Sequence, residues 1–306
     1  MIALTKKPES VLIPGFGTLV LDCEDECFNQ LVLNSVHPYT HQPRRFGITN
    51  LTSPPQAVQL KRTRWQDMTM FASQRLPMLL GTITHKAFEK LDLPGILTEQ
   101  KYEIVREVNG APATVVTIID REQWHTPDCV SVTDLKTGSC YAAMGEPKAD
   151  YIAQVNICAH ALREKHGTGL EIRGLHLSYW CKDWVAGSFR KQPPSANVVQ
   201  EVPVWGPAQC EDYLMNRLVL HIKAEDGMRV GCKDKEDRWK DDKWAVMKKG
   251  RKTAVKLFDD AESAGEWLRE QNDQRLLSIE HRAGQPRRCM FYCDAAGVCP
   301  QFEGDR

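Results

Sequence analysis

Hydrophobic and polar residues follow a strand-like pattern in two neighbouring stretches in the middle of the chain. β-Forming residues fill positions 113–119 and 130–133, and each stretch leads directly into an aspartate, Asp120 and Asp134 respectively. A polar, proline-containing segment, 121–128, lies between them. This pattern predicts two antiparallel strands joined by a loop, with Asp120 at the end of the first strand.

The flanking segments have the periodicity of helices and strands and extend this pair to a larger unit. Apolar residues recur at helical spacing in 149–165, at Ile152, Val155, Ala159 and Leu162. The expected elements are a helix over 79–89, a strand over 98–108, the two central strands, a helix over 149–165 and a strand over 171–180. The predicted succession is therefore α-β-β-β-α-β.

Segments outside this succession have patterns of their own. Ser53, Pro54 and Pro55 predict the start of a basic helix, with Ser53 as N-cap and a proline in the first turn. Prolines interrupt 183–207, which is predicted to be a loop, and 207–225 has the pattern of a packing helix. The pattern over 244–258 predicts a hairpin with a basic turn, whose positive charges could contact DNA phosphates.

The central strands also carry candidate chemistry. Asp134 and Lys136 are two positions apart, so their side chains project from one face of a strand while Leu135 points into the core. With Asp120 at the end of the partner strand, two carboxylates and an ammonium converge. Carboxylates suit Mg²⁺, and a lysine beside such an ion can orient a water and stabilise charge on a phosphate. An isolated Asp-x-Lys is more often an exposed surface pair.

The order of motifs around this site carries a family resemblance. Gly81-x₃-His85-x₃-Glu89, then an aspartate, then Asp-x-Lys-Thr, then a helix bearing Gln154, resembles the PD-(D/E)XK nuclease superfamily. More narrowly, the chain is similar to the RecB-type branch, which includes phage exonucleases and CRISPR-associated iron–sulfur nucleases. The resemblance extends roughly from Ile48 to Phe302. It implies an α/β fold, with a restriction-endonuclease-like αβββαβ core, a mixed sheet flanked by helices, and a cysteine-bearing C-terminal extension.

The resemblance also implies roles for individual residues. By the resemblance, Mg²⁺ or Mn²⁺ is expected to be bound by Asp120, Asp134, the Leu135 carbonyl and His85. Lys136 is expected to position the nucleophilic water, and Gln154 to support this lysine or the DNA. Glu99 is expected to match an acidic residue on the first core strand. The chain departs from the family at Thr117, where a glycine is usual, and at Cys158, where a tyrosine is usual. These departures concern substrate contacts more than the chemistry.

Composition agrees with a globular protein and leaves the nucleic-acid question open. The chain has 306 residues, 42% of them hydrophobic, and a formal charge of zero, which does not by itself announce a nucleic-acid binder. The positive charge is gathered in islands that either contact DNA phosphates or form a solvated face. The candidate DNA-binding residues are Lys61, Arg62, Arg64, Lys248, Lys249, Arg251 and Lys252.

Cysteine usage points to a reducing compartment and to a second candidate site. The eleven cysteines are scattered, and no secretory leader or membrane segment is recognisable, so we expect a cytosolic protein, in the host cytoplasm if phage-encoded. Cys289, Cys293 and Cys299 form a dense run near the C-terminus, with Cys232 as the preferred fourth ligand and Cys23 or Cys27 as alternatives. Such a set can hold a [4Fe–4S] cluster or zinc, or consist of plain reduced thiols.

These observations predict an N-terminal extension over 1–47, a nuclease core over 48–206 and a C-terminal helix and hairpin extension over 207–306. The expected activity is that of a Mg²⁺- or Mn²⁺-dependent DNA exonuclease in phage-type recombination or processing, where exonuclease rather than endonuclease rests on the resemblance. The alternatives are a non-catalytic DNA-binding protein on the same fold and a subunit that needs a single-strand annealing protein or a helicase as partner.

Overall fold

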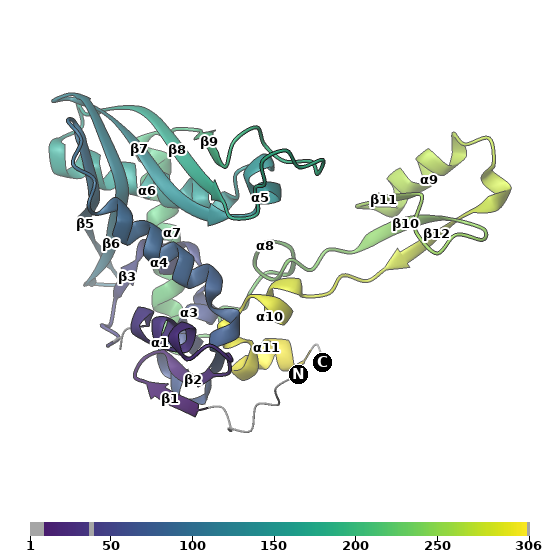
Figure 1. Ribbon diagram of the computed structural model, residues 1–306, viewed down its shortest axis with the longest axis horizontal. Coiled ribbons are helices and arrows are strands. Elements are labelled where there is room, and N and C mark those ends of the chain that lie inside the picture. Colours follow the sequence, from purple (N-terminus) through teal and green to yellow (C-terminus); the bar gives the residue numbers. More distant parts are fainter. Residues whose placement is uncertain (1–8, 37–39, 305–306) are drawn as a thin grey trace. The chain divides into compact units, whose positions relative to one another are not determined.

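The computed structural model describes residues 9–36 and 40–304, and the chain divides into two compact units, Met1–Val230 and Gly231–Arg306. The strands of the first unit are β1 (Glu9–Ile13), β2 (Gly17–Leu21), β3 (Arg45–Gly47), β4 (Thr69–Phe71), β5 (Ile96–Val108), β6 (Ala111–Thr126), β7 (Cys129–Gly138), β8 (Glu171–Cys181) and β9 (Asn197–Val202). Its α-helices are α1 (Glu26–Ser35), α2 (Ile48–Thr52), α3 (Pro55–Thr63), α4 (Leu76–Phe88), α5 (Cys140–Met144), α6 (Ala149–His166) and α7 (Pro207–Glu225) (Figure 1).

The centre of this unit is a mixed six-stranded sheet. Its order is β3-β6-β7-β8-β9, and β5 pairs with β6. The ladders β5–β6, β6–β7 and β8–β9 are antiparallel, whereas β3–β6 and β7–β8 are parallel. The order α4, β5, β6, β7, α6, β8 confirms the predicted αβββαβ succession and the α/β class, with the short helix α5 added between β7 and α6.

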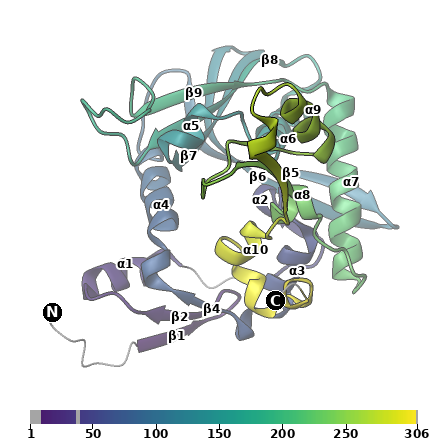
Figure 2. The same cartoon turned by 90° about the vertical axis from the view of Figure 1, so that its right-hand side faces the viewer.

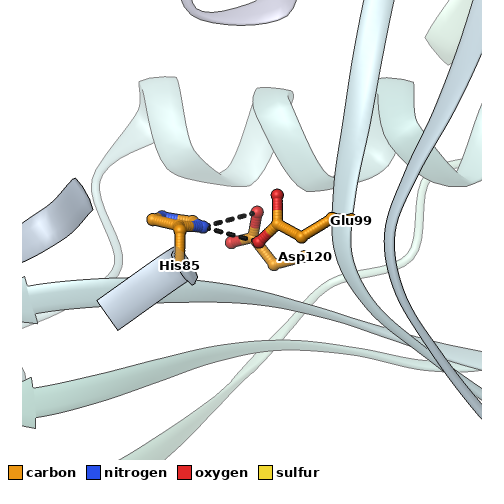
Figure 3. A group of neighbouring side chains, drawn as sticks. All are labelled: His85, Glu99 and Asp120. Carbon is orange, nitrogen blue, oxygen red and sulfur yellow. Dashed lines mark hydrogen bonds and ion pairs between the residues drawn. The ribbon is translucent and has the colours of Figure 1, made fainter. Parts of the chain in front are cut away.

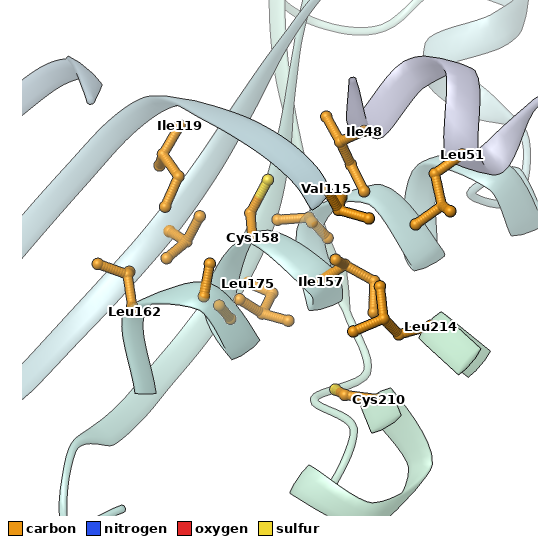
Figure 4. Packing of buried hydrophobic residues seen from close by; sticks show 14 of the residues in the cluster. Ile48, Leu51, Val115, Ile119, Ile157, Cys158, Leu162, Leu175, Cys210 and Leu214 are labelled. Carbon is orange, nitrogen blue, oxygen red and sulfur yellow. The ribbon is translucent and has the colours of Figure 1, made fainter. Parts of the chain in front are cut away.

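The hydrophobic core lies between the sheet and α6. This helix packs across β5, β6, β7 and β8, and α7 packs against α6 in turn. Ile157 and Leu162 on α6, Leu175 on β8 and Leu214 on α7 are fully buried in one cluster (Figure 4). Because α7 contributes to this core, the boundary between the units follows it, and the boundary predicted at 206/207 is wrong.

Two local predictions on the sheet are also wrong. The segment after Asp120 is not a loop: β6 continues to Thr126, since it pairs with β5 as far as Gln123 and with β7 as far as Thr126. Glu122 is fully buried there and accepts a hydrogen bond from Trp124 Nε1 at 3.0 Å. The predicted loop over 183–207 contains β9, which extends the sheet beside β8.

The basic helix begins one residue later than predicted, because its N-cap is Pro54 and not Ser53. Ser53 ends α2, and its hydroxyl donates to the Thr49 carbonyl at 2.7 Å instead of capping the next helix. Pro54 is the N-cap of α3, and Pro55 is its first residue. A proline at the first helical position loses no hydrogen bond, because that N–H has no intrahelical partner.

The N-terminal segment is part of the first unit and not a separate extension. β1 and β2 form an antiparallel pair, and β2 pairs in parallel with β4, which lies beyond position 47 (Figure 2). Leu19, Val32 and Met70 are buried together in a second, smaller core. Positions 1–8 of the predicted 1–47 extension lie outside the described residues, as do 37–39.

The second unit contains a small sheet with a helix and a cysteine-bearing end. Its elements are α8 (Asp234–Arg238), β10 (Lys243–Lys248), β11 (Lys256–Phe258), α9 (Ala261–Arg269), β12 (Leu277–Arg282), α10 (Arg287–Phe291) and α11 (Pro300–Glu303). The predicted hairpin is confirmed by the antiparallel pair β10–β11, and β12 adds a third strand on the other side of β10. No helix in the described part of the chain has the length and apolar character needed to cross a membrane.

Candidate active site

A polar cleft of about 450 Å³ opens between α2, α4, α6 and the central sheet. Six of the side chains that the sequence singles out line this cleft, and Leu135 lines it with them: His85, Glu99, Asp120, Asp134, Lys136 and Gln154. The segment from Gly47 to Asn50 at the start of α2 also lines the cleft and forms another part of its wall. The structure therefore brings the predicted metal-site residues into one place.

Asp120 lies where the burial pattern along β6 changes. Buried positions along the strand are odd-numbered up to Ile119 and even-numbered at Asp120 and Glu122. Glu99 is the residue opposite Asp120 on β5, and the residues on either side of it pair regularly with β6. Its backbone is left-handed, with φ of 51°. For a non-glycine residue this conformation costs about 1–2 kcal/mol, and such strain concentrates at functional sites.

His85, Glu99 and Asp120 form a compact cluster (Figure 3). His85 Nδ1 lies 2.8 Å from Glu99 Oε1 and 3.5 Å from Asp120 Oδ1. The other oxygen of Asp120 accepts a hydrogen bond from the Leu135 N–H at 2.6 Å. Glu89, which precedes β5 and follows His85 by one turn, instead pairs with Lys86 at 2.8 Å. Three side chains from α4, β5 and β6 thus converge on one point.

Lys136 is held by three neighbours on the other side of the cleft. Its ammonium lies 2.6 Å from Asp134 Oδ2 and donates to Gln154 Oε1 at 3.2 Å. The same nitrogen lies 4.3 Å from the ring centroid of Tyr151, a cation–π distance. Tyr151 and Gln154 are three residues apart on α6, so one helix face fixes the lysine.

Burial and crowding shift the titration of these groups. Burial, followed by repulsion from Asp134, raises the pKa of Asp120 to about 7. Burial also raises the pKa of Asp134. Burial opposes the charged form of Lys136, but attraction by the Asp134 carboxylate outweighs it and raises the pKa of this ammonium. A charged lysine therefore lies beside carboxyl groups that hold their protons more tightly than in water.

The donor set fits a divalent cation. One ligand atom from each of His85, Glu99 and Asp120 lies within 4.8 Å of the others. The buried Oδ2 atom of Asp134 pairs with the Lys136 ammonium. Among the described residues, no hydrogen bond of regular geometry reaches this oxygen. Carboxylates whose pKa is raised by crowding gain most from a nearby positive charge. Two carboxylates and an imidazole suit Mn²⁺ at least as well as Mg²⁺.

A second group of side chains that could bind a metal already has its negative charge balanced by an arginine. His160 and Glu164 on α6 and Glu211 on α7 also place ligand atoms within 4.8 Å of one another. Arg106 on β5 forms ion pairs with both glutamates, that with Glu211 at 2.7 Å. The guanidinium supplies the positive charge that a metal ion would bring, so this group ties β5 to α6 and α7.

The predicted DNA-binding residues of α3 and its C-terminus do not share one environment. Lys61 and Arg64 are exposed, and Arg64 pairs with Asp67 at 2.6 Å. The side chain of Arg62 is only 3% exposed, pairs with Glu225 and stacks over Phe46 at 4.4 Å. Arg62 is therefore a structural residue that ties α3 to α7, and its assignment to DNA contact is wrong.

The basic turn of the second unit is open to solvent. Lys249, Arg251 and Lys252 are exposed between β10 and β11, and Gly250 has a φ of 85°, a conformation that the tight turn requires of a glycine. Lys248 at the end of β10 pairs with Asp273. Three of the four predicted hairpin cations thus face solvent.

The structure gathers the four C-terminal cysteines in the second unit. Burial raises the pKa of the Cys232 thiol to about 12, and Asp237, Cys299, Cys293 and Cys289 add to the effect by repulsion. Gln301 holds the backbone of Cys232 through hydrogen bonds of 2.9 and 2.8 Å to its N–H and carbonyl. None of the four cysteines forms a disulfide. The preferred fourth ligand lies with the other three, whereas Cys23 and Cys27 belong to the first unit.

Sequence reasoning missed two parts of the site. Tyr151 stacks on Lys136, and its position one turn before Gln154 on the predicted helix was a usable signal. The wall from Gly47 to Asn50 has no motif that marks it, because its place depends on the parallel pairing of β3 with β6.

Comparisons with known proteins leave the family open. No family model matches the sequence, and no curated protein matches it. A solved structure described as "Crystal structure of SSO0001" aligns over 63% of this chain and 84% of its own, with a TM-score of 0.43 and 14% sequence identity. A likeness at that level carries no argument about activity.

Proposed function

We propose that the chain is a divalent-metal-dependent deoxyribonuclease of the PD-(D/E)XK type, an exonuclease in DNA recombination or processing. The observation that carries the proposal is the convergence of His85, Glu99 and Asp120 beside the Asp134–Lys136 pair in one cleft. The αβββαβ order of the surrounding elements supports it, because the resembled superfamily presents its acidic residues and lysine on the same strands.

The residues of the cleft have separate tasks in phosphodiester hydrolysis. His85, Glu99 and Asp120, with Asp134 beside them, would hold the divalent ion, which would supply Lewis-acid stabilisation of charge on the phosphate and ease deprotonation of water. Asp120 is kept in place by the Leu135 N–H. The Nδ1 atom of His85 faces both Glu99 and Asp120, so it is the ring nitrogen that would bind the ion.

Lys136 supplies a fixed positive charge to the phosphate. Because its pKa is raised, it stays protonated and acts by stabilising the developing negative charge and by orienting water, not as a general base. Tyr151 and Gln154 hold the ammonium in place, so the charge does not have to be reorganised during the reaction. Loss of one such preorganised group costs about 10²–10³ in rate.

The cysteine set is proposed to hold a [4Fe–4S] cluster that stabilises the second unit, with zinc as the alternative. Thiols must lose their protons to bind metal, so the raised pKa of Cys232 describes the metal-free protein and predicts proton release on loading. Iron and sulfide content and visible absorption would identify the cluster, and stoichiometric zinc in a colourless protein would identify the alternative.

The function is tested by digestion of end-labelled linear DNA beside covalently closed circular DNA, with Mg²⁺, Mn²⁺ or EDTA. Wild type is compared with Lys136→Ala and with Lys165→Ala, a change at an exposed lysine in the last turn of α6. Metal-dependent loss of linear DNA alone, absent only in Lys136→Ala, is the expected result. Cutting of the circle moves the assignment to an endonuclease at the same residues. No cutting by metal-replete protein supports the non-catalytic or partner-dependent alternative.

A further inference from the structure

Three exposed aromatic rings lie together on the second unit and form what we call the aromatic cluster: Trp239, Phe291 and Tyr292. They are 38%, 67% and 70% exposed. The rings of Trp239 and Tyr292 are 5.3 Å apart, and those of Phe291 and Tyr292 are 6.4 Å apart. Aromatic side chains normally bury most of their surface, so contiguous exposed rings indicate an interaction surface.

Arginines accompany the aromatic cluster on the same helical turn. The Arg288 guanidinium lies 5.6 Å from the ring centroid of Trp239, and Arg287 is exposed beside it. On α10 both arginines are within one turn of Phe291, so cations and rings share a side of this short helix. Arg238 is different, because it is buried and pairs with Asp234.

The backbone places Trp239 in the cluster at a cost. Trp239 ends α8 in a left-handed conformation, with φ of 53°. A bulky side chain rarely adopts this conformation, and the Trp239 side chain nevertheless keeps 38% of its surface exposed. The neighbouring Arg238 also hydrogen-bonds Cys289, and Cys289 and Cys293 bracket the segment that carries Phe291 and Tyr292. The cysteine set thus fixes both sides of the cluster.

We propose that the aromatic cluster binds single-stranded DNA. Unpaired bases would stack on Phe291 and Tyr292 and the arginines would contact the adjacent phosphates, a combination that is typical of sequence-tolerant single-strand binding. Base pairs in a duplex do not offer their faces to side chains, so duplex DNA gains nothing from these rings. The inference rests on the proposed function insofar as DNA is the substrate, but its residues are separate from those of the cleft.

The test measures the fluorescence anisotropy of labelled oligo-dT and of a duplex of equal length. The protein carries Lys136→Ala and the buffer contains EDTA, so that binding is seen without cleavage. Phe291→Leu with Tyr292→Leu, which keeps apolar bulk but removes the rings, is expected to weaken single-strand binding by about tenfold per ring, with duplex binding unchanged. Phe291→Tyr with Tyr292→Phe keeps both rings and should bind as the parent does. Leu257→Ala, a change at an exposed apolar residue of β11, is the matched control.

Unchanged single-strand affinity in the leucine double variant, an equal loss for both DNA forms, or no single-strand binding by the parent would each overturn the inference. Digestion of linear DNA by the double variant with Lys136 restored separates the two proposals. Digestion together with unchanged single-strand affinity refutes the aromatic surface alone. Ring-dependent binding without any digestion by the wild-type protein refutes the nuclease and leaves the surface standing.

Discussion

Replacement of Asp120 by asparagine should stabilise the metal-free protein at alkaline pH while removing metal binding. The folded protein raises the pKa of Asp120 from 3.8 to about 7. A carboxyl group with a raised pKa contributes stability below its unfolded pKa and loses it as the pH rises through the folded pKa. The wild-type protein therefore carries an unfavourable buried charge at pH 8 that Asp120→Asn does not carry.

The magnitude follows from the two pKa values. At about 1.4 kcal/mol per pKa unit, the contribution of Asp120 to the free energy of unfolding falls by about 2.5 kcal/mol between pH 5 and pH 8. Asparagine keeps an oxygen that can accept the Leu135 N–H, so the hydrogen bond at this position can survive the change. The difference in stability between variant and wild type should thus grow by that amount over this pH range.

The assay is urea unfolding of both proteins in EDTA at several pH values. Asp212→Asn, a change at an exposed aspartate of α7, is the control and should follow wild type throughout. Addition of Mn²⁺ at pH 8 should stabilise wild type and Asp212→Asn but not Asp120→Asn, because ligand binding to the folded state adds to its stability. Parallel pH profiles for wild type and Asp120→Asn would refute the assignment of a raised pKa, and with it the crowded carboxyl site.

Further predictions concern the other parts of the molecule. His85→Ala should raise the Mn²⁺ concentration needed for half-maximal DNA cleavage more than the Mg²⁺ concentration, since imidazole is the better ligand for manganese; an equal shift for both ions would contradict the assigned ligand. Arg62→Ala should cost about 3–5 kcal/mol in urea unfolding, because it leaves Glu225 partly buried without its cation, and should leave the salt dependence of DNA binding unchanged. A variant that combines Lys249→Gln, Arg251→Gln and Lys252→Gln neutralises the exposed turn. It should lower the salt dependence of DNA binding with little effect on the free energy of unfolding. Cys293→Ser should lower bound iron or zinc in the purified protein, and unchanged metal content would exclude the cysteine set.

The sequence was most informative where periodicity and register act together. The two central strands and the helix over 149–165 were predictable, since alternation and helical spacing fix the face that each side chain takes. Antiparallel pairing then brings Asp120 beside Asp134, because the register joins Arg121 to Thr133 one position further along. The convergence of Asp120, Asp134 and Lys136 is thus a consequence of local patterns.

What the sequence did not reveal depends on contacts between distant segments. The left-handed backbone at Glu99 and the change in burial pattern along β6 depend on strand pairing, which no single residue type encodes. Arg62 lies in a basic run and looks like a surface cation, but Glu225 on α7 removes it from solvent. The parallel pairing of β2 with β4 joins residues that are about fifty positions apart in the chain, too far for a local pattern to predict.

The most direct test of the account is an anomalous scattering map from a crystal grown with Mn²⁺. We expect one strong peak among His85, Glu99 and Asp120 and none at His160, Glu164 and Glu211, where Arg106 already supplies the positive charge. A peak at the second group, or no peak in the cleft at saturating Mn²⁺, would contradict the proposal that these residues form a metal-dependent active site.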